Sequence, residues 1–412
     1  MNPSSPIGAL SHIRVLDMSR VLAGPWAGQI FADLGAEVIK IERPGSGDDT
    51  RHWGPPYLKD RDGRDTHESA YFLAANRGKK SVAVDISKPE GQALLRQLAA
   101  QSDVLLENYK AGDLARYRLS YEDLKAINPA LIYCSITGFG QTGPMRHVAG
   151  YDFIIQAIGG LMSVTGERDD RPGGGPQKVG VAVADLTTGL YSTIAVLAAL
   201  AHRSQTGKGQ HIDMALLDVQ VAMLANVNMN YLVSGKVPSR QGNAHANIVP
   251  YQVFEAADGQ FVLAIGNDSQ FAKFCEAAGC DFHLEDRFRT NAARVRNRDV
   301  LIPLVEEVLR SRTMAEWVAT LEPLGIPLGP INSLAQVFEH PQVQSRQMRI
   351  DVPHPLAGTV PQVASPIKMS ETPPQNSTAP PLLGEHTNQV LQQRLGLSSD
   401  DIDRLRAAGV VG

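Results

Sequence analysis

The fold is decided by residues 13–42, which read IRVLDMSRVLAGPWAGQIFADLGAEVIKIE. Ile13 to Asp17 and Glu37 to Glu42 are short runs rich in Val, Ile and Leu, as in buried strands. Between them, Pro25 suits the first residue of a helix, where an N–H has no partner, and Gly35 is a typical helix stop. Two strands joined by a helix predict parallel pairing with a right-handed crossover.

The same alternation continues along the chain. A helix is expected at Pro89–Ala100, followed by strands at Asp103–Asn108 and Ala130–Ser135. Strands that alternate with helices predict a doubly wound α/β domain built on a Rossmann-like parallel sheet.

From about residue 222 the pattern changes. Phe254 to Ala264 is typical of a β-hairpin with Asp258-Gly259 at its turn, and amphipathic helices follow. Between Asp351 and Pro381 the chain has eight prolines, too many for regular structure. We therefore expect three segments: residues 1–221 begin a large α/β domain, residues 222–330 form a smaller α+β domain, and residues 331–412 form an extended strap and a final helix.

Size and composition narrow the class of protein. A chain of 412 residues is long enough for at least two domains. A formal net charge of −4, with no Lys/Arg-rich run, argues against nucleic acid or an anionic membrane as a partner. The three cysteines fit free thiols in a reducing cytoplasm, and the N-terminus lacks the features of a signal peptide. Asp185 and Gly189 interrupt the apolar run from Val179 to Ala201, which favours a buried helix over a membrane span.

Asp185 precedes a helix whose apolar side chains repeat at helical spacing from Leu186 to Ala201. One interpretation is structural, because Asp is a preferred N-cap residue. The other is catalytic. An ionised carboxylate held at a helix start, close to unpaired N–H groups, can attack a thioester and form a covalent acyl-enzyme. The residues alone leave both interpretations open.

A glycine-rich motif and the histidines point to no cofactor. Gly138-Phe-Gly-Gln-Thr-Gly143 matches the G-x-G-x-x-G of dinucleotide sites, but Pro144 follows at once and the next helix starts only near Tyr151. A nucleotide-dependent oxidoreductase is therefore the weaker alternative. None of the eleven histidines lies in a metal-binding pattern, and no G-x-S-x-G supplies a serine nucleophile. We expect neither a metal nor a tightly bound cofactor.

Seven segments, in order along nearly the whole chain, resemble the class III CoA-transferases, the family of formyl-CoA transferase, carnitine CoA-transferase and α-methylacyl-CoA racemase. They are Arg20–Pro25, Leu34–Pro44, Glu107–Tyr109, Gly138–Pro144, Gly150–Asp152, Asp185–Gly189 and Leu383–Thr387. The chain looks most similar to members that transfer CoA between succinyl-CoA and a dicarboxylate.

The resemblance implies an enzyme that moves CoA from an acyl-CoA, with succinyl-CoA as the expected donor, to a carboxylic acid, with a dicarboxylate expected. Asp185 would be the nucleophile and would form an aspartyl anhydride and then an aspartyl-CoA thioester. CoA would be a substrate rather than a resident cofactor. The family also implies an interlocked homodimer in which both chain ends build the large domain.

Further residues match family positions around the substrates. Those matched to the adenosine and phosphate end of CoA are Arg43, Val84, Asp85, Ile86, Ser87, Asn108, Tyr109, Lys110 and Arg116. Those matched to the pantetheine and the thioester are Leu22, Ala23, Ala149, Tyr151 and Asp152. Arg20 or His245 is expected to pair with the distal carboxylate of a dicarboxylate.

Two departures from the family pattern narrow the activity. Racemases carry a histidine base where this chain has Tyr151, and a phenol with a pKa near ~10 is a poor base at pH 7. Formyl-CoA transferases carry glutamine at the position of Leu22, so formate and oxalate are less expected. A racemase or epimerase of the same fold is the main alternative. A non-catalytic CoA-binding protein is disfavoured because Asp185 is present.

Overall fold

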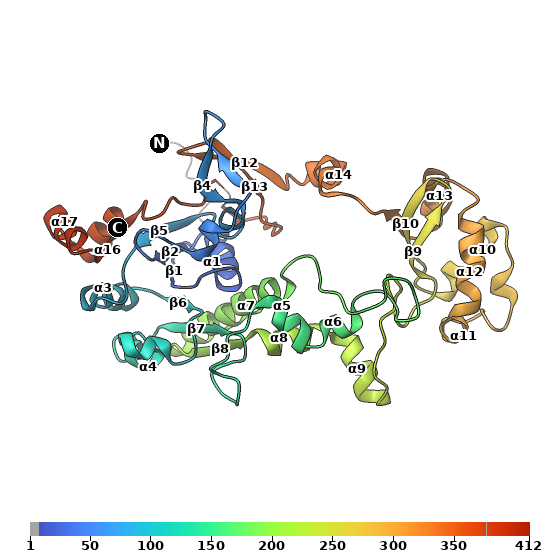
Figure 1. The fold of residues 1–412 in the computed structure, drawn as a ribbon, viewed down its shortest axis with the longest axis horizontal. Helices are drawn as coiled ribbons and strands as arrows, with labels where there is room; N and C mark the ends of the chain where they lie inside the picture. Colours follow the sequence, from blue (N-terminus) through green and yellow to red (C-terminus); the bar gives the residue numbers. More distant parts are fainter. Residues whose placement is uncertain (1–7, 376) are drawn as a thin grey trace. The chain divides into compact units, whose positions relative to one another are not determined.

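The computed structural model describes residues 8–375 and 377–412; residues 1–7, where we expect no signal peptide, lie outside the described part. The chain divides into two units (Figure 1). The first comprises the residues up to Gly160 together with Val179–Met229 and Pro341–Gly412. The second comprises Leu161–Lys178 and Asn230–His340.

These bounds differ from the segments expected from the sequence. Residues 161–178, expected in the large domain, belong to the second unit because they pair with the chain near Arg240. Gly242 N–H donates to Gly166 O at 3.1 Å, and Arg240 Nε donates to Glu167 O at 3.2 Å. Residues 331–340 also belong to the second unit, and residues 222–229 to the first.

A six-stranded sheet forms the first unit, in the order β5-β2-β1-β6-β7-β8. All of its neighbouring strands pair in parallel, which confirms the predicted Rossmann-like fold. The strands are β1 (Arg14–Asp17), β2 (Glu37–Glu42), β5 (Lys79–Ala83), β6 (Val104–Glu107), β7 (Ile132–Thr137) and β8 (His211–Ala215).

Helices cover both faces of this sheet. Val15 and Leu16 are neighbours on β1, and they point into opposite cores because side chains alternate along a strand. On the face of Val15 lie α1 (Ala23–Asp33) and α7 (Val183–Thr206). On the face of Leu16 lie α3 (Pro89–Ala100) and α16 (Thr387–Leu395), so the C-terminal segment returns to the first unit. The first unit is therefore built from both ends of the chain.

The order of the strands places a topological switch point at β1. The chain passes from β1 to β2 on one side, whereas β6 lies on the other side. Loops that leave β1 and β6 diverge to opposite faces, and this opens a crevice at their carboxyl ends. Ligands of doubly wound α/β proteins bind in such crevices.

Helix α7 is long and apolar enough to cross a membrane by length and composition. In the structure it packs against α1, β7 and α8 (Leu216–Met223), as a core helix of the first unit does. The remaining elements before residue 230 are β3 (Tyr57–Lys59), β4 (Asp65–Ser69), α2 (Ala70–Ala75), α4 (Tyr121–Lys125), α5 (Asp152–Ile158) and α6 (Leu161–Val164); α9 spans Ala225–Ser234.

The second unit is a smaller α+β fold. Its sheet has the antiparallel order β11-β10-β9, and its core contains Trp317, whose side chain is fully buried. Gly259 pairs with Ala256, so the hairpin turn is Ala257-Asp258, one residue earlier than expected. The elements are β9 (Tyr251–Ala256), β10 (Gly259–Ala264), α10 (Asp268–Ala278), α11 (Asn291–Arg296), α12 (Arg298–Leu309), α13 (Met314–Leu321), β11 (Leu328–Pro330) and α14 (Leu334–Glu339).

The proline-rich segment is not the wholly irregular strap that we expected. It begins with a hairpin of β12 (Arg349–His354) and β13 (Gly358–Val363), which contain Pro353 and Pro361. Half of the N–H groups in a two-stranded ribbon point away from the partner strand, so proline is tolerated there. Helix α15 (Pro341–Ser345) precedes this segment in the chain. Helices α16 and α17 (Ser399–Ala407) follow it.

Candidate active site

A cavity of about 310 Å³ opens at the carboxyl ends of β1, β6 and β7, at the switch point of the sheet. Nine of the predicted site residues line it: Arg20, Leu22, Ala23, Asn108, Tyr109, Lys110, Ala149, Tyr151 and Asp185. The sequence analysis missed Val21, Asp49, Ala111, Asp113, Ile136, Thr137, Gly138, Arg146, Val148, Gly150 and Leu216, which complete the lining. The whole cavity belongs to the first unit.

Asp185 is the third residue of α7, and the N-cap of this helix is Ala182. The interpretation of Asp185 as an N-cap is therefore wrong. Asp152 takes over the capping role from a neighbouring helix: its Oδ1 accepts hydrogen bonds from Ala184 N–H at 2.8 Å and Asp185 N–H at 3.4 Å. Because Asp152 occupies these N–H groups, the expectation that they are unpaired beside Asp185 is also wrong.

The same arrangement changes the acidity of Asp185. Burial first, and then the negative charge of Asp152, raise the pKa of Asp185 to about 7. A carboxylate with a raised pKa is more basic, and hence a stronger nucleophile once it is ionised. Burial and the charge of Asp185 in turn raise the pKa of Tyr71 to about 12, so this phenol stays a neutral hydrogen-bond donor. No motif in the sequence pointed to Tyr71.

The loop after β1 is fixed to the loop after β6. Arg20 N–H donates to Asn108 Oδ1 at 2.9 Å, and Asn108 Nδ2 donates to Arg20 O at 2.7 Å. The Arg20 guanidinium lies 5.2 Å from the centre of the Tyr109 ring, and Arg20 Nη1 lies 3.4 Å from Asp49 Oδ2. The amide of Asn108, expected near adenosine, therefore joins the two walls of the cavity.

Other predicted residues do not line this cavity. β5 ends at Ala83, and Val84, Asp85, Ile86 and Ser87 form the loop that follows this strand. The Asp85 carboxylate closes a turn by accepting from Ser87 N–H and Ser87 O–H. Those hydrogen bonds lower the pKa of Asp85, with a smaller contribution from the charge of Arg43. Arg43 and the loop after β5 thus form a separate polar group at the ends of β2 and β5.

Arg116 and His245 also lie outside the lining. Arg116 Nη2 is 3.8 Å from the carboxylate of Asp113, which does line the cavity, so Arg116 lies at its rim. His245 belongs to the second unit, where its Nδ1 accepts from Asn247 N–H at 3.0 Å. The described residues contain no group of three or more His, Cys, Asp or Glu side chains placed to hold a metal.

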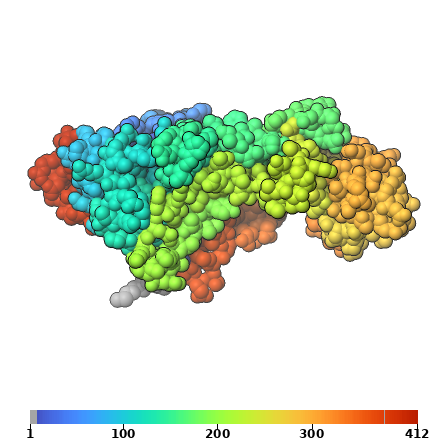
Figure 2. Space-filling view, turned by 90° about the horizontal axis from the view of Figure 1, so that it is seen from below, coloured from blue at the N-terminus to red at the C-terminus, as the bar shows by residue number. Residues whose placement is uncertain are grey.

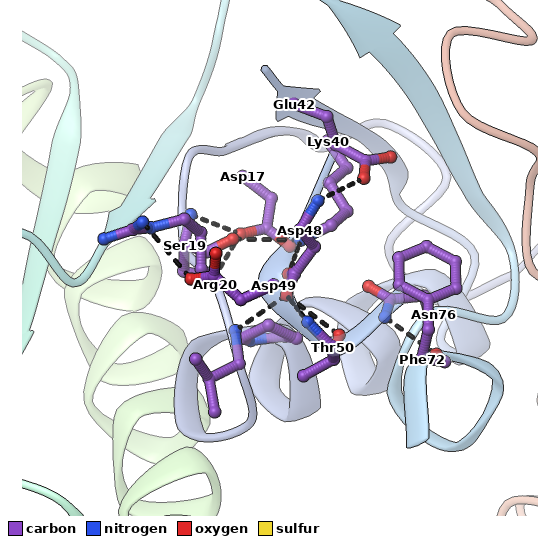
Figure 3. Close-up of polar contacts among 12 residues, drawn as sticks. Asp17, Ser19, Arg20, Lys40, Glu42, Asp48, Asp49, Thr50, Phe72 and Asn76 are labelled. Atoms are coloured by element: carbon purple, nitrogen blue, oxygen red, sulfur yellow. Dashed lines mark hydrogen bonds and ion pairs between the residues drawn. The ribbon is translucent and has the colours of Figure 1, made fainter. Parts of the chain in front are cut away.

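The first unit contains buried ion pairs that the sequence analysis missed, and Figure 3 shows the surroundings of one of them, Lys40 and Asp48. Lys40 Nζ lies 2.8 Å from Asp48 Oδ2, and Lys79 Nζ lies 2.9 Å from Asp17 Oδ2, with all four side chains fully buried. The charge of Lys40 and hydrogen bonds to the carboxylate outweigh burial and lower the pKa of Asp48 to about 2. One signal was present in the sequence, because Lys40 lies between Ile39 and Ile41 in the middle of a predicted buried strand.

A larger cavity of about 710 Å³ lies within the second unit. One of its arginines, Arg168, is ion-paired with Asp170 and Asp299 at 2.9 and 3.1 Å. Another, Arg298, donates to Gln241 and to the His245 carbonyl. Arg168 and Arg298 are therefore engaged by protein groups, whereas the smaller cavity presents a carboxylate of raised pKa at the switch point.

The parallel sheet thus carries a cavity with a buried carboxylate at the ends of its strands, the place where doubly wound α/β proteins bind ligands. The chain belongs to CoA-transferase family III, whose model matches residues 10–387. It is 51% identical to a succinate–glutarate CoA-transferase of Agrobacterium fabrum, over 93% of this chain and 95% of the relative. It is 45% identical to a succinyl-CoA:glutarate CoA-transferase of Mus musculus, over 98% and 90% of the two chains.

Solved structures agree with this assignment. A CAIB/BAIF family protein from Brucella suis is 49% identical, with a TM-score of 0.81 over 95% of this chain and all of that one. Rv3272 from Mycobacterium tuberculosis is 30% identical, with a TM-score of 0.81 over 94% and 99% of the chains. The predicted enzyme class, a CoA-transferase, is thereby confirmed.

Proposed function

We propose that this CoA-transferase moves CoA from succinyl-CoA to a dicarboxylate, with glutarate as an acceptor, and that Asp185 is its nucleophile. The observation that carries the proposal is the position of Asp185 in a cavity at the switch point, with a pKa raised to about 7. The names of the A. fabrum and mouse relatives support these substrates.

The first half-reaction loads CoA onto the enzyme. The Asp185 carboxylate attacks the thioester carbonyl of succinyl-CoA, the C–S bond breaks, and an aspartyl–succinyl anhydride and CoA thiolate form. The thiolate then attacks the aspartyl carbonyl of the anhydride. Succinate leaves with one oxygen that came from Asp185, and an aspartyl-CoA thioester remains.

The second half-reaction reverses these steps with the acceptor. A glutarate carboxylate attacks the aspartyl thioester and releases CoA thiolate, which then attacks the glutaryl carbonyl of the new anhydride. Glutaryl-CoA leaves, and the Asp185 carboxylate is restored with one oxygen from glutarate. Each step exchanges one acyl bond for another and needs neither a metal nor an electron carrier.

The first turn of α1 is suited to stabilise the charge that develops on the attacked carbonyl. Helix α1 begins at Ala23, which lines the same cavity as Asp185. The first N–H groups of a helix have no acceptor within that helix, so they are available to an oxyanion. The N–H groups of Ala184 and Asp185 are already engaged by Asp152 and cannot serve in this way.

Arg20 is our candidate for the distal carboxylate of the acceptor. Its side chain is 45% exposed, and its contacts are a long ion pair with Asp49, at 3.4 Å, and the Tyr109 ring, whose centre is 5.2 Å away. A guanidinium with weak existing contacts can bind a carboxylate in a bidentate manner. We expect Arg20→Ala to weaken the binding of glutarate more than the binding of a monocarboxylate of equal length. We expect the same of His245→Ala if His245 binds the distal carboxylate. Unchanged diacid activity in both variants would remove these assignments.

We also propose that the protein is a homodimer. The first unit exposes large apolar side chains on α5 and α7, among them Phe153, Ile158, Leu190, Tyr191 and Ile194. Figure 2 shows the green and yellow-green surface of the segment that contains α7 and α8. Soluble monomers rarely leave such patches uncovered. Sedimentation equilibrium tests the proposal: a mass of twice the chain supports it, and a monomer at micromolar concentration contradicts it.

The functional test incubates the protein with succinyl-CoA and a panel of carboxylates and follows new CoA thioesters by mass spectrometry. Asp185→Asn is the matched variant, because it removes the nucleophile and keeps the shape of the side chain. Glutaryl-CoA formed by the wild type and not by the variant supports the proposal. Exchange of an α-proton of a branched acyl-CoA with deuterated water, without transfer to any acid, would favour a racemase instead.

A further inference from the structure

The segment between β1 and α1, Ser19–Leu22, has a backbone conformation that its sequence does not favour. Val21 has φ +70°, in the left-handed region. A β-branched residue is a genuine outlier there, because its side chain crowds its own backbone. Such conformations persist only where the surroundings hold them, and they cluster at functional sites.

Charged and polar side chains of Lys40 and Asp48 contact the backbone of this segment (Figure 3). Asp48 Oδ1 accepts from Val21 N–H at 3.2 Å, directly at the strained residue. Lys40 Nζ donates to Ser19 O at 2.9 Å and to Asp48 Oδ2 at 2.8 Å. Asp48 is itself oriented, because its Oδ1 also accepts from Thr50 N–H and Thr50 O–H. Lys40 and Asp48 together therefore bind the backbone of the segment at Ser19 and at Val21.

The buried ion pair of Lys40 and Asp48 is expected to add little to the free energy of unfolding. Lys40 and Asp48 are both fully buried, and removing two charges from water costs about as much as their attraction returns. Apolar side chains of the same size would hold the sheet and the loop together at least as well. They would not offer an acceptor to Val21 N–H or a donor to Ser19 O.

The segment leads directly into α1, which packs against α7, the helix that carries Asp185. It ends at Ala23, the first residue of α1, and Arg20 to Ala23 line the cavity together with Asp185. Gly189, one turn after Asp185 on α7, lies so close to α1 that a Cβ there would be 2.7 Å from Ala23 O. A displacement of the segment at Ala23 is therefore transmitted to the helix turn beside Asp185.

We propose that Lys40 and Asp48 are positioning residues, which hold Arg20–Ala23 in a strained conformation against Asp185 without touching the substrate. The proposal rests on the proposed function, since it assigns a role in the same CoA-transfer site. It predicts a loss of turnover that exceeds any loss of folded protein.

A matched pair of double variants tests the proposal. Lys40→Met with Asp48→Leu removes the positioning pair and leaves no unpaired buried charge. Arg77→Met with Asp33→Leu removes another buried ion pair, of 2.7 Å, which does not line the cavity. In the first variant we expect amide exchange at Arg20–Ala23 to quicken at least about tenfold and kcat to fall roughly 10- to 100-fold, with KM for succinyl-CoA within about threefold.

In the second double variant we expect both quantities to stay near the wild-type values. Equal exchange at Arg20–Ala23 and equal kcat in the two double variants would overturn the proposal. If the wild type transfers no CoA, the proposed function fails, and the exchange comparison alone still decides whether Lys40 and Asp48 hold the segment.

A second comparison applies if either double variant does not fold. Val21→Gly and Val21→Ala both remove the side-chain contacts of Val21, but only glycine adopts φ +70° without strain. Because alanine still disfavours the conformation that the proposal requires, we expect kcat of Val21→Ala to lie several-fold below that of Val21→Gly. Equal kcat values in these two variants would overturn the proposal.

Discussion

Replacing the proposed nucleophile by its neutral isostere should stabilise the fold. Asp185 is partly buried beside Asp152, and these surroundings raise its pKa from 3.8 to about 7. Its charge is therefore unfavourable in the folded chain and costs nothing comparable in the unfolded chain. Asp185→Asn removes that charge and keeps the size and shape of the side chain.

The magnitude follows from the shift in pKa. A rise of about three pH units, at about 1.4 kcal/mol per unit, sets an upper limit of about 4 kcal/mol. Solvent screening at the partly exposed carboxylate reduces the expected gain to about 1–3 kcal/mol. Between about pH 4 and pH 7 the folded wild type keeps a proton that the unfolded chain has released, so its free energy of unfolding falls as the pH rises. The advantage of Asp185→Asn should thus be complete above about pH 7 and absent below about pH 4.

Urea unfolding of both proteins at several pH values, at equal protein concentration, measures this difference. The comparison cancels groups that titrate alike in the two proteins. We expect the variant to be more stable at pH 8 and indistinguishable at the lowest pH where both fold. A variant that is less stable at pH 8, or a difference that does not depend on pH, would refute the electrostatic account of Asp185.

Three further predictions follow from the site. The pH profile of kcat/KM should rise through about pH 7, because only ionised Asp185 attacks, and Asp152→Asn should move this limb to lower pH by removing the like charge. If the rising limb of the kcat/KM profile lies at the same pH in Asp152→Asn as in the wild type, a group other than Asp185 controls that limb. Gly189→Ala should lower the free energy of unfolding by about 1–3 kcal/mol and reduce kcat, since its Cβ would lie 2.7 Å from Ala23 O. Urea unfolding and initial rates measure the two effects, and a variant with the stability and the kcat of the wild type would contradict the prediction. Arg20→Ala should raise KM for glutarate roughly tenfold, with a smaller change for a monocarboxylate, and an equal change for both acids would exclude a contact with the distal carboxylate.

The parts of the fold that local pattern determines could be predicted from the sequence. The strand Glu37–Glu42 and the helix Pro89–Ala100 have the predicted bounds, because apolar periodicity and flanking Pro and Gly residues mark them. Alternation of strands and helices was enough for the parallel sheet. The other eight predicted cavity residues were located through the family resemblance alone, whereas Asp185 was also marked by its position at the start of an apolar helix.

The features that the sequence did not reveal depend on contacts between distant segments. Asp152 caps α7 from α5, more than thirty residues away in the chain, so no capping motif precedes Asp185. Residues 161–178 join the second unit through hydrogen bonds to the chain near Arg240. The sequence does not show that Lys40 and Asp48 pair, because their contact depends on the three-dimensional path of the loop after β2.

The most direct test of the central claim follows an oxygen atom. In the proposed reaction each turnover returns Asp185 with one oxygen from the acceptor. Wild-type protein is incubated with succinyl-CoA and ¹⁸O-labelled glutarate, and the peptide that contains Asp185 is analysed by mass spectrometry. We predict that ¹⁸O accumulates on Asp185 only when both substrates are present. Glutaryl-CoA formed without any ¹⁸O on Asp185 would contradict the account, because CoA would then pass between the two acids without a covalent aspartyl intermediate.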